Sequence, residues 1–164
     1  PIKSSAASDV YKRQILYSEY SPVIDAIICQ LEDIVEVDCF TNLPENYQIY
    51  DLVVSVNYRG EENIKLLKCH HSLLPSFNSD EPVKDAFLAG VKVTGITVYF
   101  TKPERIIAQY PLFIPNDAHF EDIEKQLCYL EQVIYPIVIE KLLKNEAFDL
   151  RNISNCGGCR GCSH

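Results

Sequence analysis

An almost continuous apolar run, Leu52–Val56, limits the folds that this chain can adopt. A strand with one face in water alternates apolar and polar residues, and this run does not alternate. It therefore predicts a strand that is covered on both faces, as in a parallel sheet. Two further strands are indicated by apolar, β-branched residues, one over Ile34–Phe40 and one that ends with Ile15–Tyr17.

Helical patterns lie between the predicted strands. Ser21 followed by Pro22 is typical of a helix start, because Ser caps free N–H groups and Pro suits the first helical position. Apolar residues then recur at helical spacing as far as Leu31. The remaining expected elements are two helices, Pro82–Leu88 and Phe120–Asn145, and two neighbouring strands, Val91–Phe100 and Arg105–Ile114. Strands that alternate with helices predict an α/β fold, a doubly wound, mostly parallel sheet in three αβα layers.

The chain divides into three expected segments, residues 1–14, 15–148 and 149–164. Ser4–Gln14 resembles a translated transposon-end sequencing adapter, so we expect residues 1–14 to be foreign to the fold. A genuine polar tail is the alternative interpretation of that segment. Residues 15–148 have a length typical of one domain. The apolar pattern stops after Phe148, which predicts an appended tail.

Charge and cysteine usage exclude several classes of partner. The net charge of −8 argues against a nucleic-acid surface, which needs clustered Lys and Arg. No apolar run reaches the roughly 20 residues of a membrane span. Seven cysteines, an odd number, favour reduced thiols or metal ligands over a disulfide framework. We therefore expect a cytoplasmic protein with a small-molecule partner and make no prediction about its oligomeric state. Three cysteines within apolar patterns are expected in the core: Cys29, Cys39 and Cys128.

Two motifs flank the expected helix Pro82–Leu88. Lys68–Phe77 reads Lys-Cys-His-His-Ser-Leu-Leu-Pro-Ser-Phe, and Ala89–Phe100 reads Ala-Gly-Val-Lys-Val-Thr-Gly-Ile-Thr-Val-Tyr-Phe. Together they resemble the phosphoribosylglycinamide formyltransferase family, whose motifs read Asn-x-His-x-Ser-Leu-Leu-Pro and Gly-Val-x-x-Thr-Gly-x-Thr-Val-x-Phe. The resemblance extends more weakly from about residue 15 to about residue 148, and it implies a Rossmann-like formyltransferase fold.

The resemblance also implies an activity in purine biosynthesis, the transfer of a formyl group from 10-formyltetrahydrofolate to an amine such as glycinamide ribonucleotide. His70 matches the family's acid/base histidine, and Lys68 stands where the family has an Asn that contacts the oxyanion. The family's Asp, which tunes the histidine, has no counterpart after Phe100. Glu104 is the nearest carboxylate there, and an ordinary surface charge is the simpler interpretation of it.

The substrate positions implied by the resemblance are altered in part. The family's Gly-rich phosphate turn is replaced by Ser18–Ser21, where Glu19 would repel a phosphate, although Ser21 and the helix start remain. The pterin pocket would lie near Tyr58, Arg59 and Gly60, unless Tyr58 is simply a packed aromatic residue. One alternative is therefore a catalytically impaired binding or regulatory protein. Another is transfer to a different amine, as in methionyl-tRNA or sugar-nucleotide formyltransferases, although the acidic charge disfavours tRNA.

The C-terminal tail carries a separate signal. Three thiols are spaced two residues apart among small residues, and a histidine follows them: Cys156, Cys159, Cys162 and His164. Such spacing is typical of zinc and iron–sulfur sites. Cys69, Cys128 or a residue of another subunit could replace His164 as the fourth ligand, and a redox-active or merely flexible tail is the alternative.

Overall fold

The computed structural model describes residues 12–17, 20–58, 60 and 63–146. Its elements, in chain order, are β1 (Lys12–Tyr17), α1 (Pro22–Leu31), β2 (Glu36–Phe40), the 3₁₀ helix η1 (Tyr47–Ile49), β3 (Leu52–Val56), β4 (Leu67–His70), α2 (Pro82–Leu88), β5 (Val93–Thr101), β6 (Glu104–Phe113) and α3 (Phe120–Leu143). No helix within these ranges combines the length and the apolar character that a membrane crossing requires.

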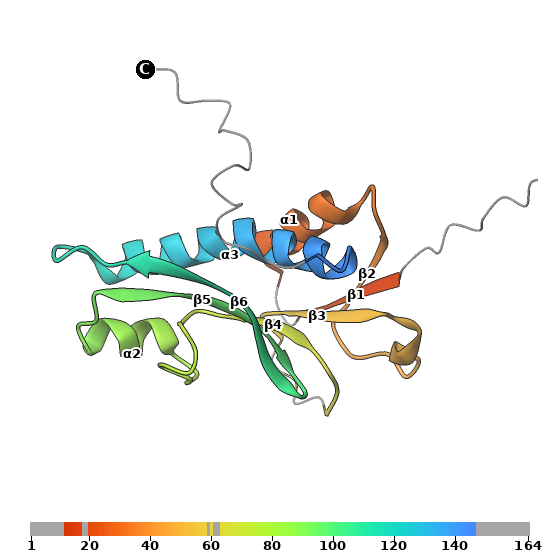
Figure 1. Cartoon of the computed structure of the whole chain (residues 1–164), viewed down its shortest axis with the longest axis horizontal. Helices are drawn as coiled ribbons and strands as arrows, with labels where there is room; N and C mark the ends of the chain where they lie inside the picture. The colour runs from red at the N-terminus through yellow and green to blue at the C-terminus, as the bar shows by residue number, and fades with distance from the viewer. Residues whose placement is uncertain (1–11, 18–19, 59, 61–62, 147–164) are drawn as a thin grey trace, which may run out of the picture.

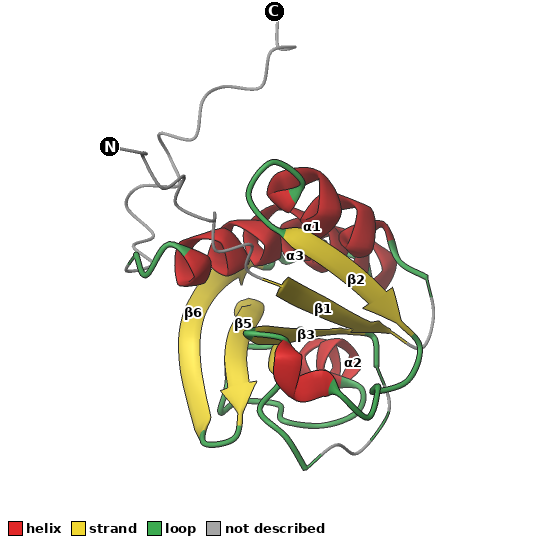
Figure 2. Cartoon of the chain, turned by 90° about the vertical axis from the view of Figure 1, so that its right-hand side faces the viewer, coloured by secondary structure: helices red, strands yellow, loops and turns green. Residues whose placement is uncertain are grey.

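In the described part of the chain, the strands form one mixed sheet in the order β2-β1-β3-β4-β5-β6. The pairs β1–β2, β1–β3 and β3–β4 are parallel, whereas β4–β5 and β5–β6 are antiparallel. The long helices α1 and α3 cover one face of the sheet, and α2 lies on the other face (Figures 1 and 2). The predicted three-layer α/β fold with a mostly parallel sheet is therefore confirmed.

The sequence explains why α1 forms and how it packs. Ser21 is the N-cap, and its Oγ accepts a hydrogen bond from the backbone N–H of Val23 at 3.3 Å. Four residues of the apolar stripe predicted for this helix, Val23, Ile24, Ile27 and Leu31, are buried against the sheet and α3, and the fifth, Ile28, is partly buried. Four buried side chains of this size contribute about 1.5–3 kcal/mol each. Burial of this stripe therefore holds α1 on the sheet.

The prediction that three cysteines lie in the core is wrong. Cys29, Cys39 and Cys128 are all exposed. On a helix, consecutive residues point about 100° apart, so the neighbours of a buried residue can face water. Cys128 follows the buried Leu127 in this way, and Cys39 lies on the outermost strand β2.

The first strand begins at Lys12, inside the segment 1–14 that we expect to be foreign. Its residues pair with β2 and β3 through the register Lys12↔Glu36 and Arg13↔Leu52. Parallel pairing uses backbone N–H and C=O groups, so residues of any type except Pro can continue the ladder. The boundary between residues 14 and 15 stays a prediction.

Replacing Tyr135 by Phe tests how α3 is attached to the sheet. The Tyr135 side chain is fully buried, and its hydroxyl lies 2.6 Å from the Leu67 carbonyl oxygen of β4 and 3.1 Å from the Ser55 carbonyl oxygen of β3. The variant leaves both carbonyls without this donor, and we expect it to lower the free energy of unfolding by about 1–3 kcal/mol. Urea unfolding measures the change; the conservative Tyr129→Phe, at an exposed position on the same helix, is expected to change little.

Candidate functional site

Two strands, β3 and β4, bring the predicted site to one edge of the sheet. The strand order reverses between β1 and β3, because the chain passes from β1 to β2 on one side and returns to β3 on the other. Open α/β sheets bind ligands at the carboxyl ends of the strands beside such a point. Tyr58 follows β3, and His70 ends β4.

A cavity of about 600 Å³ lies at this edge. Tyr58, His70 and His71 line it together with residues of the segment before α2 and of α3. Four carboxylate residues are part of its lining: Asp80, Glu81, Glu124 and Glu131. Lys84 is the cation that faces them among the described lining residues, and its Nζ is 2.9 Å from Glu81 Oε2. The cavity therefore favours neutral or cationic groups over a phosphate.

His70 is held by the turn that follows it. Its Nε2 lies 3.1 Å from the carbonyl oxygen of Phe77. A carbonyl only accepts hydrogen bonds, so Nε2 carries the proton in this arrangement and Nδ1 is the ring nitrogen left as an acceptor. Phe77 has a positive φ of 52°, which costs a non-glycine residue about 1–2 kcal/mol. The Ser72 hydroxyl donates to the carbonyl of Ser76 at 2.6 Å and so closes the same turn.

The Ser-Leu-Leu-Pro turn is fixed from β5 and β6. The Thr97 hydroxyl donates to the Ser72 carbonyl at 2.7 Å and accepts from the Leu74 N–H at 3.0 Å. Gln109 Nε2 donates to the Leu74 carbonyl at 2.8 Å and lies 3.1 Å from Thr97 Oγ1. The residues that carry the two sequence motifs thus contact one another and position the loop next to His70.

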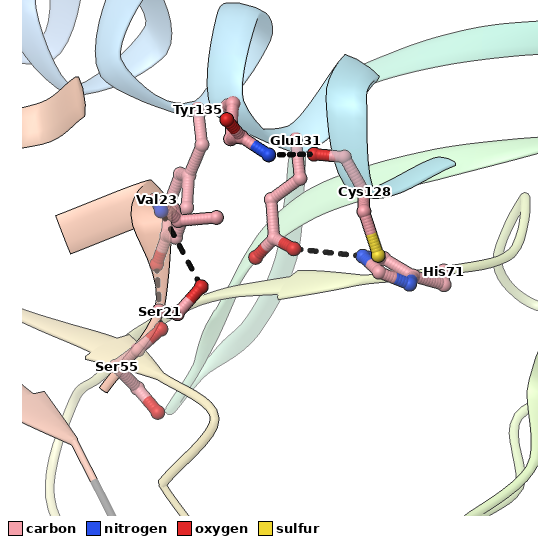
Figure 3. A network of polar contacts seen from close by, with 8 residues as sticks. Ser21, Val23, Ser55, His71, Cys128, Glu131 and Tyr135 are labelled. Carbon is pink, nitrogen blue, oxygen red and sulfur yellow. Dashed lines mark hydrogen bonds and ion pairs between the residues drawn. The ribbon is translucent and has the colours of Figure 1, made fainter. Parts of the chain in front are cut away.

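A second histidine in the cavity is paired with a carboxylate. His71 Nε2 is 2.8 Å from Glu131 Oε2, and Glu131 is only 6% exposed. Figure 3 shows the two side chains facing each other, with Cys128 on the same side of α3. Burial, followed by the Glu131 charge, raises the pKa of the nearby Cys69 thiol well above its ordinary value. Cys69 is therefore a neutral thiol at neutral pH.

Several other predicted site residues do not line the cavity. Lys68 is half-buried on β4 and is not among the residues that line the cavity. Ser21 is buried as the cap of α1, and Gly60 is packed against the Tyr58 ring. Arg59 lies outside the described residues.

Glu104 does not approach His70. In the antiparallel register, His70 pairs with Thr97 and Leu67 pairs with Phe100, so Glu104 follows the far end of β5. Its side chain is exposed there, which agrees with an ordinary surface charge. Three residues were compared with the family's catalytic residues: Lys68, His70 and Glu104. Of these, only His70 is among the described residues that line the cavity.

A second cavity, of about 520 Å³, opens at the other end of β4 and β5. Its lining includes Phe100, whose ring lies 4.1 Å from Lys65 Nζ, and the aliphatic residues Leu142 and Leu143. None of the predicted site residues lines this cavity. We therefore place the candidate site at the first cavity.

The predicted metal or cluster site lies outside the described residues, since residues 147–164 include all four of its proposed ligands, Cys156, Cys159, Cys162 and His164. Within the described ranges, no three His, Cys, Asp or Glu side chains gather as a metal site would require. The tail site stays a prediction.

Comparison with known families decides the classification. The family described as formyl transferase matches residues 49–139, which contain β3, β4, β5 and β6 and the cavity. The chain belongs to the formyl transferase family. Within it, the phosphoribosylglycinamide formyltransferase of Bacillus subtilis (strain 168) is 44% identical over 85 residues, 48% of this chain and 43% of that protein.

Other relatives and solved structures agree with this family. Formyltetrahydrofolate deformylase 2, mitochondrial, of Arabidopsis thaliana is 42% identical over 55 residues, 34% of this chain and 17% of that protein. The matches thus span less than half the length of these relatives. The phosphoribosylglycinamide formyltransferase structure from Bacillus halodurans has a TM-score of 0.66 at 21% identity and covers 84% of this chain and 100% of that one. The one from Coxiella burnetii has a TM-score of 0.69 at 17% identity, covering 84% and 89%. These likenesses show the formyl transferase fold.

The sequence did not reveal the pair His71–Glu131. One signal was present, because Glu131 lies four residues after Leu127 and three before Ile134, on the apolar stripe of α3. A carboxylate on a buried stripe needs a partner. Its partner could not be identified from the sequence, since His71 and Glu131 are 60 residues apart along the chain.

Proposed function

We propose that this formyl transferase family member transfers a formyl group from 10-formyltetrahydrofolate to an amine, with glycinamide ribonucleotide as the first acceptor to test. The observation that carries the proposal is the position of His70, within its motif, at the carboxyl end of β4 and in a cavity large enough for the reacting groups. The relative from Bacillus subtilis is named for this reaction.

The reaction makes two demands on the site. The amine attacks the formyl carbon and produces a tetrahedral oxyanion, which needs a donor, and a proton must leave the attacking nitrogen. We assign proton transfer to His70 and oxyanion stabilisation to Lys68, which precedes it on the same face of β4. We assign substrate binding to Ser21, Tyr58 and Gly60, and to Arg59, which lies outside the described residues.

A second candidate function is hydrolysis of the same donor, with water as the formyl acceptor. The four carboxylates of the cavity favour it, because they oppose the phosphate of a ribonucleotide and do not oppose water. The Arabidopsis thaliana relative is named as a deformylase.

Both functions are tested with the purified chain and 10-formyltetrahydrofolate, with and without glycinamide ribonucleotide. Formyl transfer predicts tetrahydrofolate and formylated ribonucleotide in equal amounts, whereas hydrolysis predicts tetrahydrofolate and formate without any amine. His70→Ala is expected to lower kcat by about 100-fold or more, the usual contribution of a positioned acid/base. No turnover above this variant in either assay would favour the impaired, regulatory alternative.

A further inference from the structure

The His71–Glu131 pair is unusual because its carboxylate comes from the buried side of a helix. Glu131 lies on α3 between the fully buried Leu127 and Tyr135. An isolated buried carboxylate is strongly unfavourable, and a leucine at this position would pack without that cost. The pair opens toward the cavity, since both residues line it. A paired charge at this place therefore points to chemistry in the cavity.

The two histidines of the cavity have different partners. His70 Nε2 donates to the backbone carbonyl of Phe77, which is neutral. His71 Nε2 donates to the carboxylate of Glu131 at 2.8 Å. A carboxylate stabilises an imidazolium much more than a carbonyl does, because the hydrogen bond is then charge-assisted. Of the two rings, His71 is the one whose hydrogen-bond partner is a carboxylate.

The other titratable groups around His71 do not replace Glu131. Burial raises the pKa of the Cys69 thiol on β4, and partial desolvation raises the pKa of the Cys128 thiol on α3. Both thiols are therefore neutral at neutral pH. Glu81 is paired with Lys84 near α2. The remaining lining carboxylates, Asp80 and Glu124, are exposed and screened by water.

We propose that His71 is a catalytic acid/base of the formyl-transfer reaction, and that Glu131 is the residue that positions it; this rests on the proposed function. The acceptor nitrogen uses its lone pair to bond to the formyl carbon, and its proton passes first to His70 Nδ1 and then, through solvent water, to His71 Nδ1. The bond from the formyl carbon to folate N10 then breaks with its electron pair on N10, which takes the proton from His71. The Nε2–H stays bonded to Glu131 throughout. For hydrolysis, the oxygen of water takes the place of the nitrogen.

Three variants test this assignment. His71→Gln is expected to lower kcat by about 100-fold or more, with the KM for 10-formyltetrahydrofolate changed by less than about threefold. Glu131→Gln keeps a polar side chain but removes the charge, and we expect about a tenfold loss in kcat, the rate equivalent of one charge-assisted hydrogen bond. Its KM for 10-formyltetrahydrofolate should change by less than about threefold, because Glu131 acts through His71. Glu121→Gln removes an exposed carboxylate from the same helix outside the cavity and should keep both kinetic constants.

The double variant His71→Gln/Glu131→Gln is a control for loss of folding in the single variants. It leaves no unpaired buried charge, and its two amides can bond to each other. If the residues act as one unit, its kcat should equal that of His71→Gln alone. If the wild-type protein turns over and the kcat of His71→Gln or of the double variant stays within about threefold of the wild-type value, this inference is wrong and the proposed function still stands. Wild-type protein without turnover in either assay would overturn both.

Discussion

Replacing Thr97 by valine is expected to lower the free energy of unfolding by about 2–6 kcal/mol, because two buried backbone groups lose their partner at about 1–3 kcal/mol each. These groups are the Ser72 carbonyl and the Leu74 N–H, which bond to the Thr97 hydroxyl at 2.7 and 3.0 Å. Valine has nearly the same shape, so the loss is one of hydrogen bonding and leaves packing in place. Chemical unfolding followed by circular dichroism measures it.

The same strand provides two matched controls. Thr97→Ser keeps the hydroxyl and should lose only about 1 kcal/mol, for one buried methyl group. Thr94 is also buried on β5, yet its hydroxyl has no hydrogen-bond partner among the described residues. Thr94→Val should therefore leave stability unchanged or raise it. Equal losses from Thr97→Val and Thr94→Val would contradict the role given to the Thr97 hydroxyl.

Gly95→Ala should cost about 3 kcal/mol, the upper end for an overpacked core. A Cβ at this position would lie 2.1 Å from the Tyr110 carbonyl oxygen and 2.7 Å from Leu73 Cδ2. The first atom belongs to the backbone of β6 and can move only if the β5–β6 pairing opens. The second belongs to the turn that holds His70, so the variant should lower kcat as well as the unfolding midpoint.

Gly90→Ala is a control that has the backbone strain of a replaced glycine without any steric overlap. Gly90 has a φ of 68°, and no atom lies within 4 Å of its would-be Cβ. Alanine there should cost about 1–2 kcal/mol through backbone strain alone. Its kcat should not change. A Gly95→Ala protein with normal kcat would show that Leu73 moves independently of the site.

Much of the fold could be predicted because local patterns and tertiary packing agree. The run Leu52–Val56 is buried on both faces as its composition indicated, and α2 spans the predicted residues Pro82–Leu88. The cysteines show where such agreement ends, since Cys29 and Cys128 lie within helices that contain buried residues and are nevertheless exposed. The spacing of apolar residues predicts that a helix has a buried face, but it does not predict which residues at the margin of that face are exposed.

Only the part of the site that lies within one sequence motif could be predicted. His70 was identified from its motif and lies in the cavity, whereas the partners of both histidines come from contacts that no spacing predicts. Phe77 turns back on His70 through a positive φ, and Glu131 reaches His71 from a helix 60 residues away. Contacts of this kind are set by the packing of α3 on the sheet.

The strand order has a consequence for how this protein behaves in a crowded solution. Within the described chain, β2 and β6 are the outer strands, and such strands offer free backbone groups on which another chain can add. On β2, the carboxylates of Glu36 and Asp38 repel an approaching acidic copy, and on β6, Pro111 removes one backbone donor. These side chains oppose the addition of another chain at both outer strands of the sheet.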